Sequence, residues 1–340
     1  MARNMILEAT SKNIELEDTG EEEAWTRAHL LDVDELSRDE LAQILATTAG
    51  MEEVLQRPVA RTPALRGTTI FNLFYEPSTR TRSSFELAGK VLGADVINLS
   101  VSGSSIEKGE SLVDTIRTLG AIGGHIIVIR HPASGSPYLA ARHSHAHIVN
   151  AGDGLHAHPT QAILDAYTIQ KALGSVESKK ICIVGDIRHS RVARSNIWAL
   201  TTLGAEVTLV APATLIPPGI HSTSEANTDH FSLPPVHIDH DLDRAITNAD
   251  VVIALRLQRE RMQSSYLPSL HEYVIRYQIT KERLSHAANN VIVMHPGPVN
   301  EGVEISPEIA NGDNSQIQAQ IEHGVAVRMA VLYLLSRTNQ

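Results

Sequence analysis

Short apolar runs rich in β-branched residues recur along the chain, with segments long enough for a helix between them. Strands that alternate with helices are typical of parallel sheets, because the helices cover both faces of such sheets. The pattern therefore predicts an α/β protein with two doubly wound parallel-sheet domains. The runs of the first series lie at residues 68–75, 94–100, 125–130 and 147–152, and those of the second at 179–186, 205–212, 235–241, 250–256 and 290–298.

The predicted domains follow from these two series. A chain of 340 residues, with 42% apolar and 20% charged content, is long enough for two domains of ordinary size. We predict an acidic N-terminal tail at residues 1–25, where IELEDTGEEE lacks apolar periodicity. The first domain is placed at residues 26–165 and the second at 166–311. A C-terminal helix at residues 312–337 is expected to be amphipathic and to pack back on the first domain.

Composition also excludes some classes of protein. The N-terminal segment lacks the apolar region of a signal peptide, and no uncharged apolar run approaches the length of a membrane span. A net charge of -10 argues against a nucleic-acid-binding surface. We therefore expect a cytoplasmic protein that binds neither membranes nor nucleic acids. The single cysteine, Cys182, lies in a strand-like run and is predicted to be a core thiol.

The segment EPSTRTRSSF, residues 76–85, follows the first apolar run and precedes a helix-like segment. It is predicted to be a strand-to-helix turn, whose first backbone N–H groups lack partners and attract anions. Arg80 and Arg82 add guanidinium groups, which match phosphate or carboxylate oxygens in pairs. The segment therefore indicates a phosphate site, the alternative being a capped helix with solvated arginines. The hydroxyl residues available to cap this helix are Ser78, Thr79 and Thr81.

Polar and cationic residues also follow most of the other predicted strands. Ligands of parallel α/β sheets collect at the carboxyl ends of the strands, so these residues are expected to lie near one another. A single arginine here would be an ordinary surface residue, but the shared position predicts a site for anions. In the first series the residues are Ser104, Lys108, Arg130, His158 and Gln161, and in the second they are Arg188, Arg191, Arg194, Arg256 and Gln258.

Several segments together resemble the aspartate/ornithine carbamoyltransferase family, and within it the aspartate carbamoyltransferase catalytic chains. They are FYEPSTRTRSSFE, EKGESLVDTIRTL, IVIRHPASG, GDGLHAHPTQAILDAYTI, GDIRHSRVARSN, RLQRERM and HPGPVNEGVEI. The resemblance spans residues 26–337. STRTR and HPTQ are typical of the whole family, whereas RLQRERM and HPGP indicate the aspartate branch. Ornithine carbamoyltransferases would carry a cysteine in an HCLP-like segment in place of HPGP.

The resemblance implies transfer of the carbamoyl group from carbamoyl phosphate to L-aspartate, a step of pyrimidine synthesis, without a metal or cofactor. The first domain would bind carbamoyl phosphate and the second would bind aspartate. The implied catalytic residues are Arg80, Thr81, Lys108, Arg130 and His158. The implied carbamoyl phosphate ligands are Ser78, Thr79, Arg80, Thr81, Ser104, Lys108, Arg130, His158 and Gln161. The implied aspartate ligands are Lys108, Arg191, Arg256, Gln258, Gly297 and Pro298.

The resemblance further implies a homotrimer with shared active sites. Ser104 and Lys108 lie in a segment that resembles the family's loop delivered into the site of a neighbouring chain. The alternative for this segment is an ordinary surface loop. A regulatory chain or a dihydroorotase-like protein remains open as a further partner.

A zinc site and a dinucleotide-binding fold are two other interpretations of the sequence. His143, His145 and His147 alternate along a predicted strand, so together with His156 and His158 they do not have the spacing of a zinc site. GDIRHS lacks the G-x-G-x-x-G pattern of dinucleotide-binding folds. A carbamoyltransferase for another, ornithine-like amino acid and a non-catalytic scaffold remain as alternative functions.

Glu301 departs from the family pattern, in which a cation is common at this position. A carboxylate near the implied aspartate site would repel the substrate at low dielectric.

Overall fold

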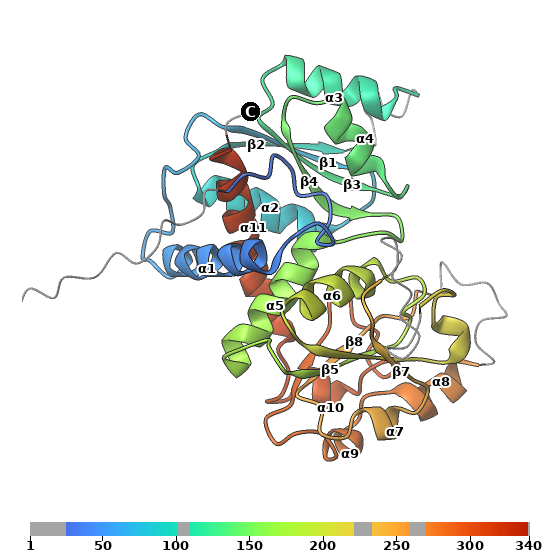
Figure 1. The fold of residues 1–340 in the computed structure, drawn as a ribbon. Helices are drawn as coiled ribbons and strands as arrows, with labels where there is room; N and C mark the ends of the chain where they lie inside the picture. Colours follow the sequence, from blue (N-terminus) through green and yellow to red (C-terminus); the bar gives the residue numbers. More distant parts are fainter. Residues whose placement is uncertain (1–24, 101–108, 221–232, 259–268, 339–340) are drawn as a thin grey trace, which may run out of the picture.

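Two parallel β-sheets form the framework of the protein (Figure 1). The computed structural model describes residues 25–100, 109–220, 233–258 and 269–338. The sheets have the strand orders β2-β1-β3-β4 and β7-β6-β5-β8-β9, and all their pairings are parallel. The predicted fold class, with two doubly wound parallel sheets, is confirmed.

The first sheet alternates with helices in the expected order. Its strands are β1 (Thr69–Phe74), β2 (Asp95–Ser100), β3 (Ile126–His131) and β4 (His147–Asp153). The accompanying helices are α1 (Arg38–Leu55), α2 (Thr79–Val91), α3 (Leu112–Ala121), α4 (Ser136–Arg142) and α5 (Pro159–Leu173). Strand β4 is buried along its whole length, because helices cover both faces of the sheet. Residues 126–129 of β3 are buried as well, which explains why an apolar run such as IIVI is continuous rather than alternating.

The second sheet is built in the same way. Its strands are β5 (Lys180–Val184), β6 (Glu206–Val210), β7 (His237–Asp239), β8 (Val251–Ala254) and β9 (Ile292–Met294). The helical elements are α6 (Arg191–Thr202), the 3-10 helix η2 (Ala213–Leu215), α7 (Leu242–Ala245), α8 (Leu270–Tyr277), α9 (Lys281–Leu284) and α10 (Pro307–Ala310). Cys182 lies in β5 and is 2% exposed, so the predicted core thiol is confirmed.

The last helix, α11 (Ile317–Ser336), returns to the first half of the molecule. It packs against α1, α2 and α5, and Figure 1 shows it beside α1 and α2. The prediction of an amphipathic helix was wrong in detail, since every residue from Ala326 to Leu332 is buried. Three neighbouring helices surround this stretch, and a helix enclosed in this way has no solvent-facing stripe. Residues 312–316 precede the helix rather than form part of it.

Two further sequence predictions required correction. Of the three histidines expected to alternate along one strand, only His147 lies in β4, whereas His143 ends α4 and His145 lies in the connecting turn. The proline and glycine before this segment start α4, and the chain must then turn before β4 begins. Trp25, placed in the predicted tail at residues 1–25, is 9% exposed and packs in the hydrophobic core, so it does not belong to a tail, whereas residues 1–24 lie outside the described residues. Most of the predicted surface loop at residues 221–235 also lies outside them.

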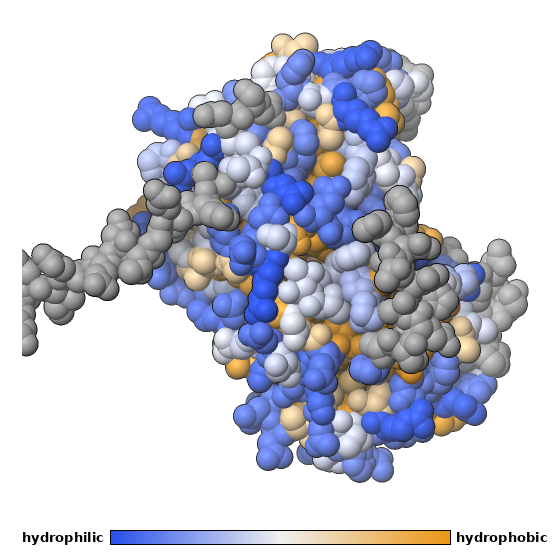
Figure 2. Space-filling model, in the orientation of Figure 1, coloured by the Kyte–Doolittle hydropathy of each residue, from blue (hydrophilic) through white to orange (hydrophobic). Residues whose placement is uncertain are grey.

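The surface in Figure 2 is mostly hydrophilic, and hydrophobic residues show as small patches between the hydrophilic ones. This distribution agrees with the formal net charge of -10. None of the described helices is both long and apolar enough to cross a membrane.

Candidate active site

Three adjacent strands in each sheet end at residues predicted for the site. In the first sheet β1, β3 and β4 are neighbours, and in the second β5, β8 and β9 are neighbours. The carboxyl ends of the first three carry or lead into Arg80, Arg130 and His158. Those of the second three lead into Arg191, Arg256 and residues 295–298. The contacts described next join these two edges.

The turn after β1 places Arg80 in the first turn of α2. Ser78 is the N-cap of this helix, as predicted, but its hydroxyl makes no capping hydrogen bond. Thr81 is buried at 6% exposure, whereas Thr79 and Arg80 are exposed. The helix therefore offers its first N–H groups and one guanidinium to an anion.

Glu76 joins guanidinium groups from both halves of the molecule. Its Oε2 accepts a hydrogen bond from Nη2 of Arg191 at 2.9 Å and lies 3.4 Å from Nε of Arg130. Arg130 also donates to the carbonyl oxygen of Ala151 at 3.3 Å, and Arg191 donates to that of Gly154 at 3.2 Å. Arg130 is the next-to-last residue of β3 and Arg191 is the first residue of α6, so one carboxylate holds an arginine from each half of the molecule.

His158 is the N-cap of α5, and it is 5% exposed. Its backbone N–H donates to Oγ of Ser195 at 2.9 Å. Its Nδ1 has no hydrogen-bond partner among the residues that the structure describes. Burial, followed by the positive charges of Arg130 and Arg191, holds the pKa of His158 well below its usual value. The imidazole is therefore neutral, and its single N–H can donate to a carbonyl oxygen.

Gln161, in the first turn of α5, ends in a buried polar cluster. Its Nε2 donates to Oδ1 of Asp165 at 2.9 Å. Asp165 also accepts hydrogen bonds from Nε2 of Gln320 at 2.7 Å and from Nδ2 of Asn196 at 2.9 Å. Helices α5, α6 and α11 are thereby connected at the base of the site.

Asp186 organises the second half of the site. Its carboxylate accepts hydrogen bonds from the backbone N–H of Gln258 at 3.3 Å and from Nδ1 of His189 at 2.8 Å. The carboxyl group is fully buried, and this burial raises its pKa. Asp186 therefore ties the turn before Arg191 to the segment that carries Arg256 and Gln258.

The loop after β9 contacts the first half of the molecule. Nδ1 of His295 accepts a hydrogen bond from the Gly297 N–H at 2.8 Å, so the proton lies on Nε2, which donates to Oε1 of Glu304 at 3.2 Å. Gly297 has a φ of 69°. A β-carbon built on Gly297 would lie 3.2 Å from both Cζ and Nη1 of Arg80. Gly297 therefore lies so close to this guanidinium that a β-carbon at this position would be crowded.

Pro298 and Glu301 are the exposed residues of this loop that the sequence singled out. Water and salt screen an exposed carboxylate. Glu301 therefore departs from the family pattern without placing a buried negative charge in the site.

Replacing Gly297 by alanine is expected to weaken phosphate binding about tenfold, or about 1.4 kcal/mol. The added β-carbon would displace the Arg80 guanidinium, and the positive φ disfavours any L-residue. Calorimetric titration with inorganic phosphate measures the effect. Gly302→Ala is the matched control, because Gly302 has a φ of 82° and no atom within 4 Å of the added carbon. Equal losses in the two variants would show that the contact with Arg80 is unimportant.

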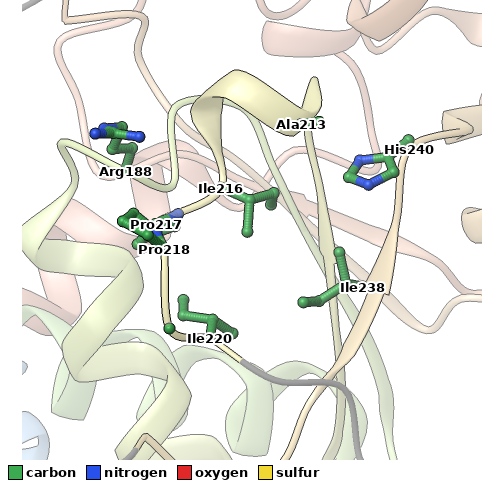
Figure 3. Close-up of a pocket in the computed structure, with 9 residues that line it drawn as sticks. Arg188, Ala213, Ile216, Pro217, Pro218, Ile220, Ile238 and His240 are labelled. Carbon is green, nitrogen blue, oxygen red and sulfur yellow. The ribbon is translucent and has the colours of Figure 1, made fainter.

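A separate hollow of about 360 Å³ lies beside the second half of the site (Figure 3). Isoleucines and prolines form most of its wall, and Arg188 and His240 lie on opposite sides of it. The backbone N–H of Arg188 donates to the Leu215 carbonyl at 2.8 Å, which connects the hollow to the turn before Arg191. Of the residues that the sequence predicts near the anion site, Arg188 lines this hollow.

Part of the predicted site lies outside the described residues. This part comprises Ser104, Lys108 and residues 259–262, the end of RLQRERM. Within the described ranges, no group of three or more His, Cys, Asp or Glu side chains has an arrangement that could hold a metal ion.

Glu76 and Asp165 belong to the site, but they were not predicted from the sequence. A sequence feature could have indicated Glu76, since it is the one acidic residue within EPSTRTRSSF. Asp165 follows Gln161 by four residues on a helix, a spacing that places two side chains on the same face. The partners of both residues come from distant segments, and only the tertiary structure identifies those partners.

Comparison with known proteins agrees with this geometry. The family model described as the aspartate/ornithine carbamoyltransferase carbamoyl-P binding domain matches residues 28–171, and the one described as the Asp/Orn binding domain matches residues 177–335. The chain is similar to the aspartate carbamoyltransferase catalytic subunit of Dehalococcoides mccartyi, with 53% identity over 94% of this chain and 95% of the relative. The corresponding subunit of Roseiflexus sp. is 54% identical over 91% of this chain and 95% of the relative.

Solved structures of the same kind are also similar. Aspartate transcarbamoylase from Trypanosoma cruzi in complex with N-(phosphonacetyl)-L-aspartic acid has a TM-score of 0.81 and 31% identity, covering 91% of this chain and 96% of that one. The complex of that enzyme with carbamoyl phosphate and aspartate has a TM-score of 0.79 with the same identity and coverage.

Proposed function

Because the chain belongs to the aspartate/ornithine carbamoyltransferase family, we propose that it transfers the carbamoyl group of carbamoyl phosphate to the amine of L-aspartate. The products are N-carbamoyl-L-aspartate and phosphate, and the reaction serves pyrimidine synthesis. Relatives at 53% and 54% identity carry the name aspartate carbamoyltransferase catalytic subunit, which supports the aspartate branch over an ornithine-like one.

The observation that carries the proposal is the meeting of arginines from both halves of the molecule around Glu76. Both substrates are anions, one with a phosphate and the other with two carboxylates. We assign the phosphate to the turn at residues 78–81 and to Arg130. We assign the carboxylates of aspartate to Arg191, Arg256 and Gln258. Holding the two reactants in this way supplies on the order of 7 to 11 kcal/mol of the barrier through positioning.

His158 is assigned to the carbonyl oxygen of the carbamoyl group. Attack by the amine of aspartate on the carbonyl carbon puts negative charge on this oxygen, and the bond to the phosphate oxygen then breaks. A neutral imidazole N–H aimed at that oxygen stabilises the developing charge by about 3 kcal/mol. Arg80, Thr81 and Arg130 stabilise the departing phosphate, which can itself accept the proton of the amine. Gln161 is assigned to the carbamoyl amino group, and Gly297 and Pro298 to the amine of aspartate.

We also propose which domain binds which substrate. Residues 26–165, together with the C-terminal segment at 312–337, would bind carbamoyl phosphate, and residues 166–311 would bind aspartate. The packing of α11 against α1, α2 and α5 supports the assignment of the C-terminal segment to the first domain.

The proposed assembly is a homotrimer with shared sites, working in the cytoplasm. Ser104 and Lys108 follow β2, which lies at the edge of the first sheet. Ile97 on β2 is 43% exposed, and a strand with one unpaired side and an exposed apolar residue is suited to contact with another chain. A regulatory chain or a dihydroorotase-like partner remains a hypothesis.

A bisubstrate mimic tests the function. N-(phosphonacetyl)-L-aspartate is expected to bind about a hundredfold or more tighter than phosphonoacetate, because linking the two halves makes the second contact intramolecular. Titration calorimetry measures both affinities. Equal affinities would contradict the assignment of the second half of the site to aspartate.

A turnover assay separates the alternative functions. Carbamoyl phosphate is supplied with aspartate or with ornithine, and the carbamoylated amino acid is measured. Product from ornithine alone would overturn the choice of aspartate. Tight binding of the mimic without product from either amino acid would favour the scaffold.

A further inference from the structure

We infer that Asp165 is a positioning residue that determines specificity for a carbamoyl group, because it orients the side-chain amide of Gln161. In this orientation Gln161 presents its amide oxygen, an acceptor, to the amino group of the ligand. The inference rests on the proposed function and extends it to a residue that acts only through another.

The geometry around Asp165 consists of three N–H donors on one carboxylate. Oδ1 accepts from Nε2 of Gln161 at 2.9 Å and from Nε2 of Gln320 at 2.7 Å, and Oδ2 accepts from Nδ2 of Asn196 at 2.9 Å. All four side chains are buried, at 8% exposure or less. Buried polar groups of this kind cannot exchange partners with bulk water, so their donor and acceptor roles are fixed by one another.

An ionised carboxylate can only accept hydrogen bonds. Burial raises the pKa of Asp165 to about 6, so the group is ionised at pH 7.5. An amide oxygen turned toward it would meet a like charge, whereas the amide nitrogen donates to it. Gln161 therefore directs Nε2 to Asp165 and Oε1 to the opposite side. A ligand group that meets Oε1 must donate, as the NH₂ of a carbamoyl group does and the CH₃ of an acetyl group does not.

The same carboxylate orients a second amide toward the loop after β9. Since Nε2 of Gln320 donates to Asp165, its Oε1 accepts the backbone N–H of His295 at 2.9 Å. His295 in turn receives the N–H of Gly297, whose loop contacts Arg80. Gln320 thus donates to the same carboxylate as Gln161, but its amide oxygen binds the loop after β9 rather than facing the ligand. A substitution of Gln320 is therefore the matched control.

The test compares two stable phosphonates that differ in one group. Phosphonoacetamide carries NH₂ on its carbonyl carbon and acetonylphosphonate carries CH₃. Calorimetry on the full chain at pH 7.5 is expected to show about a tenfold preference of the wild type for the amide, the value of one hydrogen bond made to a buried acceptor. In Asp165→Asn the two affinities are expected to become nearly equal. Asn196 donates to the side-chain oxygen at position 165, so in this variant the side-chain nitrogen takes the place that faces Gln161. The amide of Gln161 then rotates, so that its oxygen accepts from this nitrogen and its own nitrogen faces the ligand.

Further variants separate positioning from a purely structural role. Asp165→Ser, which admits a water able to donate or accept, is expected to lose the preference as well. Gln320→Met is expected to keep it. The double variant Asp165→Asn with Gln161→Glu moves the carboxylate from position 165 to position 161. It is expected to restore the preference for the amide, because either oxygen of the glutamate can accept a hydrogen bond from the ligand. Thermal melting and phosphate affinity report whether each variant is folded.

Two results would overturn the inference. One is a folded Asp165 variant that retains the wild-type preference for the amide, and the other is a wild type without any preference. Carbamoyl transfer to aspartate by the wild type is assayed in parallel. Its failure would overturn the proposed function, whereas normal transfer with an unchanged preference in the variants would overturn only the role of Asp165.

Discussion

Replacing Arg80 by alanine is expected to reduce kcat for carbamoyl transfer about a thousandfold. A guanidinium that stabilises a leaving phosphate is worth this much in other phosphate-handling sites. Arg80 also contacts the loop at Gly297, so its loss would loosen the contact between the two halves. Steady-state kinetics with both substrates varied measures the effect.

Two further alanine variants make this prediction specific. Arg82→Ala is the matched control, because positions 80 and 82 lie on opposite faces of α2 and Arg82 is equally exposed. Its kcat is expected to stay within about threefold of the wild type. Arg256→Ala is expected to raise KM for aspartate about a hundredfold and to leave the affinity for carbamoyl phosphate nearly unchanged, because charge-assisted bonds to different substrates are lost. Equal losses from Arg80→Ala and Arg82→Ala would mean that only the net charge of the turn matters.

Mixing two inactive variants is expected to restore about a quarter of the wild-type activity. In the proposed trimer, Arg80 of one chain and Lys108 of its neighbour build one site. In random trimers of Arg80→Ala and Lys108→Ala chains mixed in equal amounts, each interface has about one chance in four of joining an intact Arg80 to an intact Lys108. The experiment dissociates the two variants, mixes them, reassociates them and measures carbamoyl transfer.

Chain exchange must be verified independently, for example with chains of two different masses. A mixture of Arg80→Ala and Arg256→Ala chains is a useful control, because it tests whether Arg80 and Arg256 of one site come from the same chain. At an aspartate concentration far below the raised KM of Arg256→Ala, activity should stay near zero, since neither kind of chain carries both intact residues. A mixture of the first pair that stays as inactive as its parents despite verified exchange would mean that Lys108 serves its own chain or no site.

Much of the fold followed from local patterns along the chain. Continuous apolar runs such as the IIVI of β3 indicate strands buried on both faces, and helices between such strands favour parallel pairing. The strand-to-helix turn predicted within residues 76–85 is shorter than expected, because α2 already begins at Thr79. Sequence patterns failed where tertiary packing overrides periodicity. Helix α11 is enclosed by three other helices, so its apolar positions do not form one stripe.

The residue types needed for binding anions were determined by the sequence alone, because arginines, hydroxyls and a histidine follow strands whose order in a parallel sheet places their ends together. The pairing between them was decided only by the tertiary structure. Glu76 meets Arg191 across 115 positions of sequence, and Asp165 meets Gln320 across 155. No local pattern encodes such pairs, since they form only when the strand ends of the two sheets come together and α11 packs against α5. The protonation of His158 is likewise a tertiary property, because desolvation and neighbouring guanidinium groups keep its imidazole neutral.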